Sequence, residues 1–358
     1  MASKNLEYVA APMVNQSDLP FRLLVRNHGA TATYTQMYLP EKLLNDQEYF
    51  EYHLRDLTGG PPEYAHPVII QLGGNDVETI VQAGRKLQAY CDGIDLNLGC
   101  PQESARDGNF GGYLLGQKNW PCVEGIVSAM AQSFIVPASA KLRLCQPLEK
   151  TTELAMRLEA AGVSWITLHP RTVSARRRRQ GAANLDLVKE LKAHLRVPVI
   201  SNGNVRGPSD LQKNLQYTGA DGLMVGETLL GNPCLFSADA TVTDAHERLP
   251  DPVDISLEYL AICNLYPGTK LSAIQTHIRH FVEFQCGRRS WYPKFRAALG
   301  ACTSVDEIER VLNVKVERWR GRPPRLSQKL EDCEDVLTDE DPPRRIQADE
   351  DDLPLGLE

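Results

Sequence analysis

Two kinds of segment alternate along the chain from residue 8 to residue 236. Short runs rich in β-branched and apolar residues occupy 8–13, 31–37, 67–74, 93–100, 138–144, 164–171, 198–205 and 222–227. Segments with apolar residues at helical spacing lie between them, as in 76–90, 151–162 and 184–195. This α/β alternation predicts parallel strands joined by right-handed crossovers. Eight regular units predict a TIM (β/α)8 barrel and favour it over a doubly wound sheet.

The pattern changes after Phe236, which divides the chain into four predicted parts. Residues 1–236 form the predicted barrel domain, and the polar, Pro-containing residues 237–253 are typical of a linker. Residues 254–322 have helical periodicity without strand signals and predict a small helical-bundle domain. Residues 323–358 are rich in Asp, Glu and Pro and predict a disordered acidic tail.

Charge is segregated along the chain. The formal net charge is −7, but residues 331–358 alone hold 12 acidic and 2 basic residues. Residues 270–330 hold 13 Lys and Arg against 5 Asp and Glu. A basic segment of this kind marks either a polyanion-binding face or a solvated helical surface, and charge alone favours the second.

Several classes of protein are disfavoured. The chain has no run of 18 apolar residues and its first residues have no signal-peptide pattern, so we expect no membrane span and no secretion. The nine cysteines are odd in number and form no CxxC pair, so we expect neither a disulfide framework nor a metal site. A reducing, cytoplasmic location fits best. The run Arg176–Arg179 leaves a nuclear location open.

Polar residues gather at the carboxyl ends of the predicted strands, where the loops of such barrels carry the chemistry. They are Gln71, Asn97, Cys100, Lys141, Arg143, His169, Arg171, Asn202, Gly203, Asn204 and Gly226, with Pro12 and Met13 after the first strand. Side-chain amides can form hydrogen bonds with the carbonyl and N–H groups of a ring, and a lysine can stabilise negative charge on it. The backbone N–H groups of the turns after the seventh and eighth strands can bind a phosphate. A planar, polar, phosphate-bearing cofactor is therefore predicted. Each residue alone has a structural alternative, such as a satisfied histidine or a buried cysteine, but their common position favours a site.

The motifs DLNLGCPQ (95–102), ITLHPRT (166–172) and VISNGNV (199–205) occur at strand ends in this order. With APMVNQSDLPFRLLVRNHGA (11–30), they resemble the tRNA-dihydrouridine synthases over residues 7–320. These are FMN-dependent enzymes that reduce uridine in tRNA to 5,6-dihydrouridine. VNQSDL, Leu98 and Glu227 are most similar to the eukaryotic subfamily that modifies uridines 16 and 17, whereas GVSWITLHPRT leans toward the subfamily acting at 20a and 20b.

The resemblance assigns roles residue by residue. Cys100 matches the catalytic cysteine. The matches to flavin-contacting positions are Pro12, Met13, Gln71, Lys141, His169, Asn202, Gly203, Asn204 and Gly226. The predicted substrate contacts are Asn97, Arg143, Arg171, Arg288, Arg289, Lys294 and Arg296.

The sequence departs from the family pattern in three places. Pro170 replaces the usual glycine after His169, and Arg176–Arg179 replaces a more mixed loop. Glu227 lacks the positive charge that often supports the flavin phosphate, so Arg206 or backbone amides would have to compensate.

The resemblance also implies a mechanism. NADPH reduces the flavin, and hydride then passes to C6 of a uridine flipped out of tRNA while Cys100 protonates C5. A thiol suits this acid because it stays protonated near pH 7, unlike a carboxyl group. A flexible loop at Gln102–Tyr113 is expected to close Cys100 over the substrate only when tRNA is bound. No GxGxxG motif follows a strand, so the sequence offers no separate dinucleotide-binding domain. NADPH would therefore have to stack on the flavin in the same opening of the barrel.

Two other functions remain open from the sequence. A small-molecule FMN reductase would share the cofactor site but would not need a basic helical domain. A catalytically silent RNA-binding protein would not need Cys100, Lys141 and His169. In each case we expect a monomer.

Overall fold

The computed structural model describes residues 6–174, 181–237 and 249–325. Arg176–Arg179, most of the predicted linker and nearly all of the predicted acidic tail lie outside these residues. Within the described part, no helix is long and apolar enough to cross a membrane.

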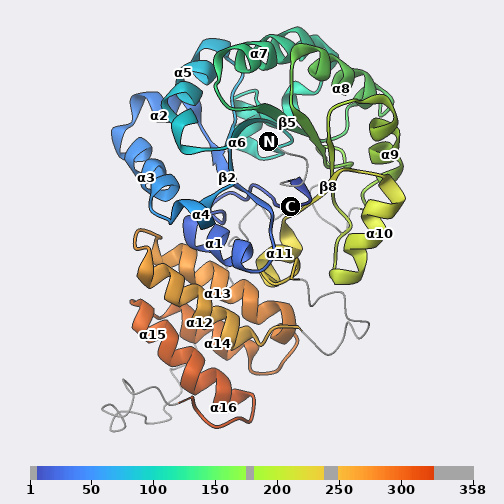
Figure 1. Ribbon diagram of the computed structural model, residues 1–358. Helices are drawn as coiled ribbons and strands as arrows, with labels where there is room; N and C mark the ends of the chain where they lie inside the picture. The colour runs from blue at the N-terminus through green and yellow to red at the C-terminus, as the bar shows by residue number, and fades with distance from the viewer. Residues whose placement is uncertain (1–5, 175–180, 238–248, 326–358) are drawn as a thin grey trace.

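Eight parallel strands form a closed barrel in sequence order (Figure 1). They are β1 (Tyr8–Ala10), β2 (Ala32–Tyr38), β3 (Val68–Leu72), β4 (Gly93–Leu98), β5 (Ala138–Leu142), β6 (Trp165–Leu168), β7 (Val199–Asn202) and β8 (Gly222–Val225). The barrel closes where Val9 of β1 pairs with Met224 of β8. Most strand residues are buried on both faces, which explains why the strands read as nearly continuous apolar runs.

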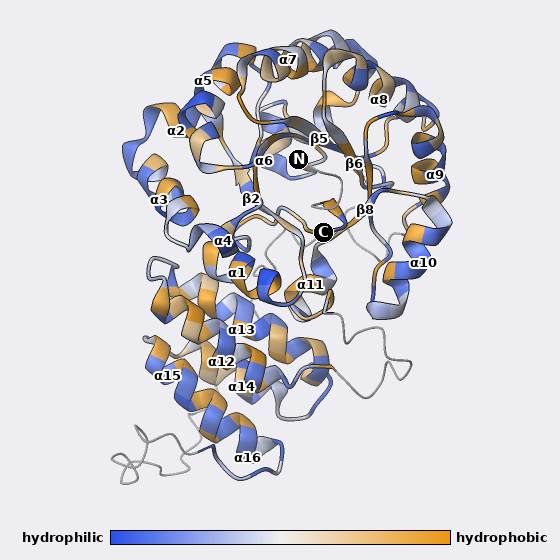
Figure 2. Cartoon of the chain, in the orientation of Figure 1, coloured by the Kyte–Doolittle hydropathy of each residue, from blue (hydrophilic) through white to orange (hydrophobic). Residues whose placement is uncertain are grey.

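Most of the helices surround the barrel, and all but the last, which follows β8, lie between successive strands. They are α1 (Leu19–Asn27), α2 (Pro40–Asn45), α3 (Gln47–Thr58), α4 (Pro62–Ala65), α5 (Val77–Leu87), α6 (Glu103–Asp107), α7 (Trp120–Ser133), α8 (Lys150–Ala161), α9 (Leu185–His194), α10 (Pro208–Thr218) and α11 (Glu227–Gly231). Local sequence sets their ends. Asp76 caps α5 by accepting a hydrogen bond from the Thr79 amide, and Gly219 ends α10 in the left-handed conformation. Figure 2 shows hydrophilic and hydrophobic stretches on the same outer helices, as expected for helices between a barrel and solvent.

A second group of helices follows the barrel. It comprises α12 (Pro252–Leu265), α13 (Leu271–Cys286), α14 (Tyr292–Gly300), α15 (Val305–Arg310), a π-helical turn (Val311–Val316) and α16 (Glu317–Trp319). These helices lie together beside α1 and α11 in Figure 1, and α12 packs on α1 while α13 packs on α11. The predicted barrel with C-terminal helices is thus confirmed.

The two parts share a hydrophobic core and a buried polar contact. One contiguous cluster runs from Leu24 and Phe236 to Tyr259, Phe281 and Leu312. At its edge, the fully buried ring of His277 on α13 lies 2.7 Å from Asp18, through Nε2 and Oδ1. The Tyr259 hydroxyl donates to the other oxygen of Asp18 at 2.9 Å. The helices are therefore fixed to the barrel by both apolar packing and hydrogen bonds to the buried Asp18 carboxyl group.

Candidate active site

The structure brings the predicted strand-end residues to one mouth of the barrel. Gln71, Asn97, Lys141 and Asn202 lie on β3, β4, β5 and β7, close to the carboxyl end of each strand. The other predicted residues of this group follow their strands directly: Pro12, Met13, Cys100, Arg143, His169, Arg171, Gly203, Asn204 and Gly226. Parallel strands present these ends on the same side of a barrel, so the set forms one site.

A chain of side-chain hydrogen bonds crosses the floor of the mouth. Asn97 donates from Nδ2 to Oε1 of Gln71 at 2.7 Å, and Gln71 donates from Nε2 to Oδ2 of Asp95 at 2.8 Å. Ser139 donates to the other oxygen of Asp95 at 2.6 Å. At the opposite end, Asn97 Oδ1 accepts from the amides of Gly99 and Cys100 at 2.9 and 2.8 Å. The turn that carries Cys100 is thus tied to the strand interior.

Cys100 lies beneath a folded loop and its side chain is buried. The Gly112 amide donates to the Cys100 carbonyl at 3.1 Å, and the Tyr113 hydroxyl donates to the Pro101 carbonyl at 3.1 Å. The loop includes α6 and a 3₁₀ turn at Gly111–Leu114. Phe110 and Ala105 pack with Cys100 in a small apolar cluster. The sequence predicted that this loop closes only when tRNA is bound, whereas in the structure of the chain alone it already packs against Cys100.

Basic groups surround the mouth. Burial, followed by the nearby charge of Arg143, lowers the pKa of Lys141 to about 8, although Asp95 and Cys100 act in the opposite direction. Burial also brings the pKa of His169 well below its usual value, and the charges of Arg143 and Lys141 add to this effect. His169 is therefore neutral near pH 7, whereas much of Lys141 is protonated.

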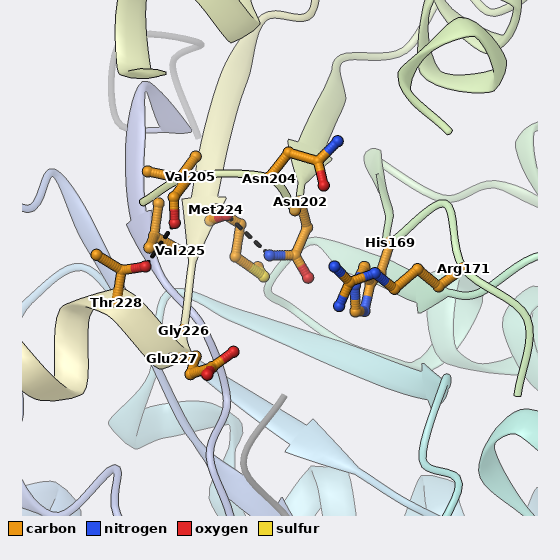
Figure 3. A pocket seen from close by; sticks show the side chains of 11 residues that line it. His169, Arg171, Asn202, Asn204, Val205, Met224, Val225, Gly226, Glu227 and Thr228 are labelled. Carbon is orange, nitrogen blue, oxygen red and sulfur yellow. Dashed lines mark hydrogen bonds between the residues drawn. The ribbon is translucent and has the colours of Figure 1, made fainter. Parts of the chain in front are cut away.

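A hollow opens between the ends of β7 and β8 (Figure 3). Its lining residues are His169, Arg171, Asn202, Gly203, Asn204, Val205, Met224, Val225, Gly226, Glu227 and Thr228. In Figure 3, His169 and Arg171 lie side by side across the hollow from Thr228. Asn202 donates to the Met224 carbonyl at 2.8 Å, which leaves its side-chain oxygen facing the hollow. The hollow therefore combines amide, imidazole and guanidinium groups.

Glycines allow the backbone to approach this hollow closely. Gly203 has a φ of +127°, and a Cβ there would lie 2.9 Å from the Ala183 Cβ. A Cβ at Gly226 would lie 3.0 Å from the sulfur of Met13, which is itself buried. Larger residues at these two turns would disturb the lining.

Arg206 does not line this hollow. Its side chain is 77% exposed and its Nε lies 3.4 Å from Asp210. Arg171 lines the hollow instead, on the same surface as Glu227. Compensation for Glu227 was expected from Arg206 or from backbone amides, and the structure brings Arg171, which follows β6, to the hollow in place of Arg206.

Comparison with known proteins identifies the family. The family model described as "Dihydrouridine synthase (Dus)" matches residues 9–318. The chain belongs to the dihydrouridine synthase family. The resemblance stated from the motifs is thereby confirmed.

Curated relatives of this dihydrouridine synthase family member include two positional types. A tRNA-dihydrouridine(16/17) synthase [NAD(P)(+)]-like protein of Rattus norvegicus is 36% identical over 76% of this chain and 58% of its own length. The tRNA-dihydrouridine(16/17) synthase of Saccharomyces cerevisiae is 31% identical over 87% and 73%. A tRNA-dihydrouridine(20a/20b) synthase-like protein of Homo sapiens is 32% identical over 78% and 83%. The chain thus spans little more than half the length of the rodent relatives.

Two solved structures resemble this chain in fold alone, since their sequence identity to it is low. A 2-naphthoyl-CoA reductase complexed with 2-naphthoyl-CoA gives a TM-score of 0.52 at 12% identity, covering 64% of this chain and 49% of its own. TcOYE with pHBA gives 0.50 at 10% identity, covering 73% of this chain and 95% of its own.

The remaining predicted residues of this family member lie on the C-terminal helices. Arg288 and Arg289 occupy the turn between α13 and α14, and Lys294 and Arg296 lie on α14; all four are exposed. Among the described residues, no group of three or more His, Cys, Asp or Glu side chains could hold a metal ion.

Sequence reasoning missed Asp95 and Ser139. The prediction considered only the residues at the ends of the strands, and both Asp95 and Ser139 lie two positions before a predicted site residue. The available signal was the strand period of two, which places Asp95 on the same face as Asn97 and Ser139 on the same face as Lys141.

Proposed function

We propose that this protein reduces uridine to 5,6-dihydrouridine in tRNA, with FMN as its flavin and NADPH as its electron source. The observation that carries the proposal is the position of Cys100. It lies at the mouth of the barrel, beside the hydrogen-bonded amides of Asn97 and Gln71, and the half-buried Lys141 and the buried His169 lie at the same mouth. The family match and the relatives' names support the same chemistry.

The mouth suits a flavin. Among the described residues, no carboxylate lies within ion-pair distance of Lys141, so this partly buried cation is available to an electron-rich ring. Gln71 and Asn202 would orient the ring, and His169 as a neutral imidazole would add one donor or acceptor. Pro12 and Met13 would flank the group, and the backbone at Gly203, Asn204 and Gly226 would face its phosphate, with Arg171 as the nearby cation.

The chain's own residues then assist the reduction of uracil. The bound flavin, once reduced, supplies a hydride for C6. Cys100 donates a proton to C5, and Lys141 stabilises negative charge that develops on the base. Asn97 and Arg143 would orient the base, since they lie on the strand ends next to Cys100. The folded loop above Cys100 would exclude water from the proton donor.

We propose positions 16 and 17 of the D-loop as the targets, because relatives of the 16/17 type reach 36% identity. Positions 20a and 20b are the second candidate, supported by the relative of that type at 32% identity. Arg288, Arg289, Lys294 and Arg296 would bind the RNA backbone from the helical part.

The test is Cys100→Ala, with Cys91→Ala as its control. Cys91 lies just before the amino end of the same strand and, like Cys100, is 8% exposed. We expect Cys100→Ala to remain yellow and to be reduced by NADPH, with dihydrouridine formation lowered by about 10²–10⁴-fold, the range for loss of a general acid. Cys91→Ala should keep full activity.

Full dihydrouridine formation by Cys100→Ala would refute the proton-donor role. Protein purified without flavin, or rapid NADPH oxidation with a small enone and none with tRNA, would refute the proposed function. Mapping dihydrouridine in tRNA from cells that lack the protein separates the two positional candidates.

A further inference from the structure

Asp95 is a carboxyl group in the middle of a barrel strand, with no exposure to solvent. Burying a charge is costly unless hydrogen bonds compensate, and Asp95 accepts from Gln71 and Ser139. Burial raises its pKa to about 6, while the bonds from Ser139 and Gln71 and the charge of Lys141 limit the rise. The carboxylate form therefore predominates at pH 7.

The direction of every hydrogen bond from Cys100 to Asp95 is determined. A backbone amide can only donate, so the atom of Asn97 that faces Gly99 and Cys100 must be Oδ1. Asn97 must then turn Nδ2 to Gln71, which accepts with Oε1. Gln71 in turn must present Nε2 to the next group, and that group must accept. Asp95 is the acceptor that ends the chain.

We propose that Asp95 is a positioning residue, which fixes the orientation of the Gln71 and Asn97 amides and thereby holds the turn that carries Cys100. This role rests on the proposed function, since the position of the turn matters to catalysis only if Cys100 donates the proton. Asp95 itself lies beneath the mouth and acts through the two amides.

The same chain sets what Asn97 can offer a ligand. Its side-chain oxygen already accepts two amide hydrogen bonds, and its nitrogen has given one hydrogen to Gln71. The remaining capacity is one N–H donor, since an amide has two acceptor sites and two hydrogens. Asn97 therefore matches a carbonyl oxygen of uracil rather than its N3–H.

Two substitutions test whether Asp95 acts as a hydrogen-bond acceptor or only fills space in the barrel. Asp95→Asn keeps an acceptor oxygen for Gln71, because its own NH₂ can turn to the Ser139 hydroxyl, which also accepts. Asp95→Leu keeps a similar volume but accepts nothing, so it leaves Gln71 Nε2 buried without a partner. Ser201→Ala is the control, since this buried barrel hydroxyl has no hydrogen-bond partner among the described residues.

The readout is hydrogen exchange at the Gly99 and Cys100 amides of the full chain, resolved by fragmentation mass spectrometry with and without flavin. We expect exchange in Asp95→Leu to be about tenfold faster or more at these amides, as for loss of a buried hydrogen bond, and within about threefold of native in Asp95→Asn. Dihydrouridine formation should fall in Asp95→Leu while reduction by NADPH continues. Ser201→Ala should change neither quantity.

Unchanged exchange in Asp95→Leu would overturn the proposal, and so would equally fast exchange in Asp95→Asn. If Asp95→Leu does not fold, Gln71→Met interrupts the same chain one link nearer Cys100 and must give the same fast exchange. Exchange does not depend on turnover. An active Cys100→Ala variant would therefore refute the proton-donor role and leave this measurement to decide the hydrogen-bond chain.

Discussion

Gly111 decides how closely the loop can cover Cys100. Its φ is +62°, in the left-handed region, and a Cβ built there would lie 2.9 Å from the Cys100 Cβ and 3.1 Å from the Cys100 carbonyl oxygen. The neighbouring Gly112 amide donates to that same carbonyl. The Gly111→Ala variant must therefore either strain its backbone against Cys100 or move the loop away.

The size of the effect follows from these two features. A left-handed conformation costs an L-residue about 1–2 kcal/mol. A carbon–carbon contact under 3.0 Å adds repulsion that the backbone of Cys100 cannot easily relieve. A combined penalty of about 2 kcal/mol on the covered state multiplies the ratio of uncovered to covered loop by about 30.

The assay is the rate of Cys100 alkylation by iodoacetamide, followed by peptide mass spectrometry. Cys100 is 8% exposed, so the reagent reaches it mainly when the loop opens. We expect Gly111→Ala to react about 30-fold faster than the native protein, up to the rate of an uncovered thiol.

The matched control is Gly116→Ala, in the turn that follows the same loop. Gly116 has a φ of −65°, and a Cβ there meets no atom within 4 Å. Its alkylation rate should equal that of the native protein. Equal rates for Gly111→Ala and the native chain would show that Gly111 does not control access to Cys100.

The remaining predictions concern the C-terminal helices. Asp18→Ala should lower the free energy of unfolding in urea by about 2–6 kcal/mol, because it leaves two buried hydrogen-bonding groups, the His277 ring and the Tyr259 hydroxyl, without their acceptor at about 1–3 kcal/mol each. Burial raises the pKa of Asp18, but His277 and the Tyr259 hydroxyl outweigh it and the pKa lies below its usual value, so the contribution is complete above about pH 4 and lost as pH falls through the folded pKa. An unchanged difference in stability between the native chain and Asp18→Ala down to pH 2 would contradict this. Charge reversal of four exposed cations should weaken tRNA binding and flatten its dependence on salt: Arg288, Arg289, Lys294 and Arg296. Reversal of Arg85 and Lys213, exposed on α5 and α10, is the control, and an equal loss per reversed charge in both sets would mean that binding reflects total charge alone.

Local patterns were enough to predict the fold. Each predicted β run overlaps one observed strand, and the helices α12–α16 lie within or next to the region 254–322 that was predicted to be helical. Seven of the eight runs extended too far at their carboxyl ends, as where the run 8–13 gives a strand of only Tyr8–Ala10, whereas β2 continues one residue beyond the run 31–37. Apolar residues such as Met13 continue the pattern into the mouth, where they are buried against loops and make no ladder hydrogen bonds.

Contacts between distant segments could not be read from the sequence. Asp18 and His277 are separated by 259 residues, and nothing local to either predicts their pairing. Asp95 begins the motif DLNLGCPQ, yet its partners come from two neighbouring strands and depend on barrel register. The folded loop over Cys100 depends on Gly111, and a glycine in a sequence does not reveal which atom it approaches.

The continuous core between α1, α11 and the C-terminal helices has a consequence for how a target nucleotide would be selected. Because α12 and α13 share buried apolar residues with the barrel, hinge motion between the two parts would expose that surface to water. The separation between the cations around Arg288 and the thiol of Cys100 is therefore fixed. Under the proposed function, RNA bound at those cations would bring to Cys100 only a nucleotide that lies at this distance along the bent RNA, so the separation would select the position that is modified.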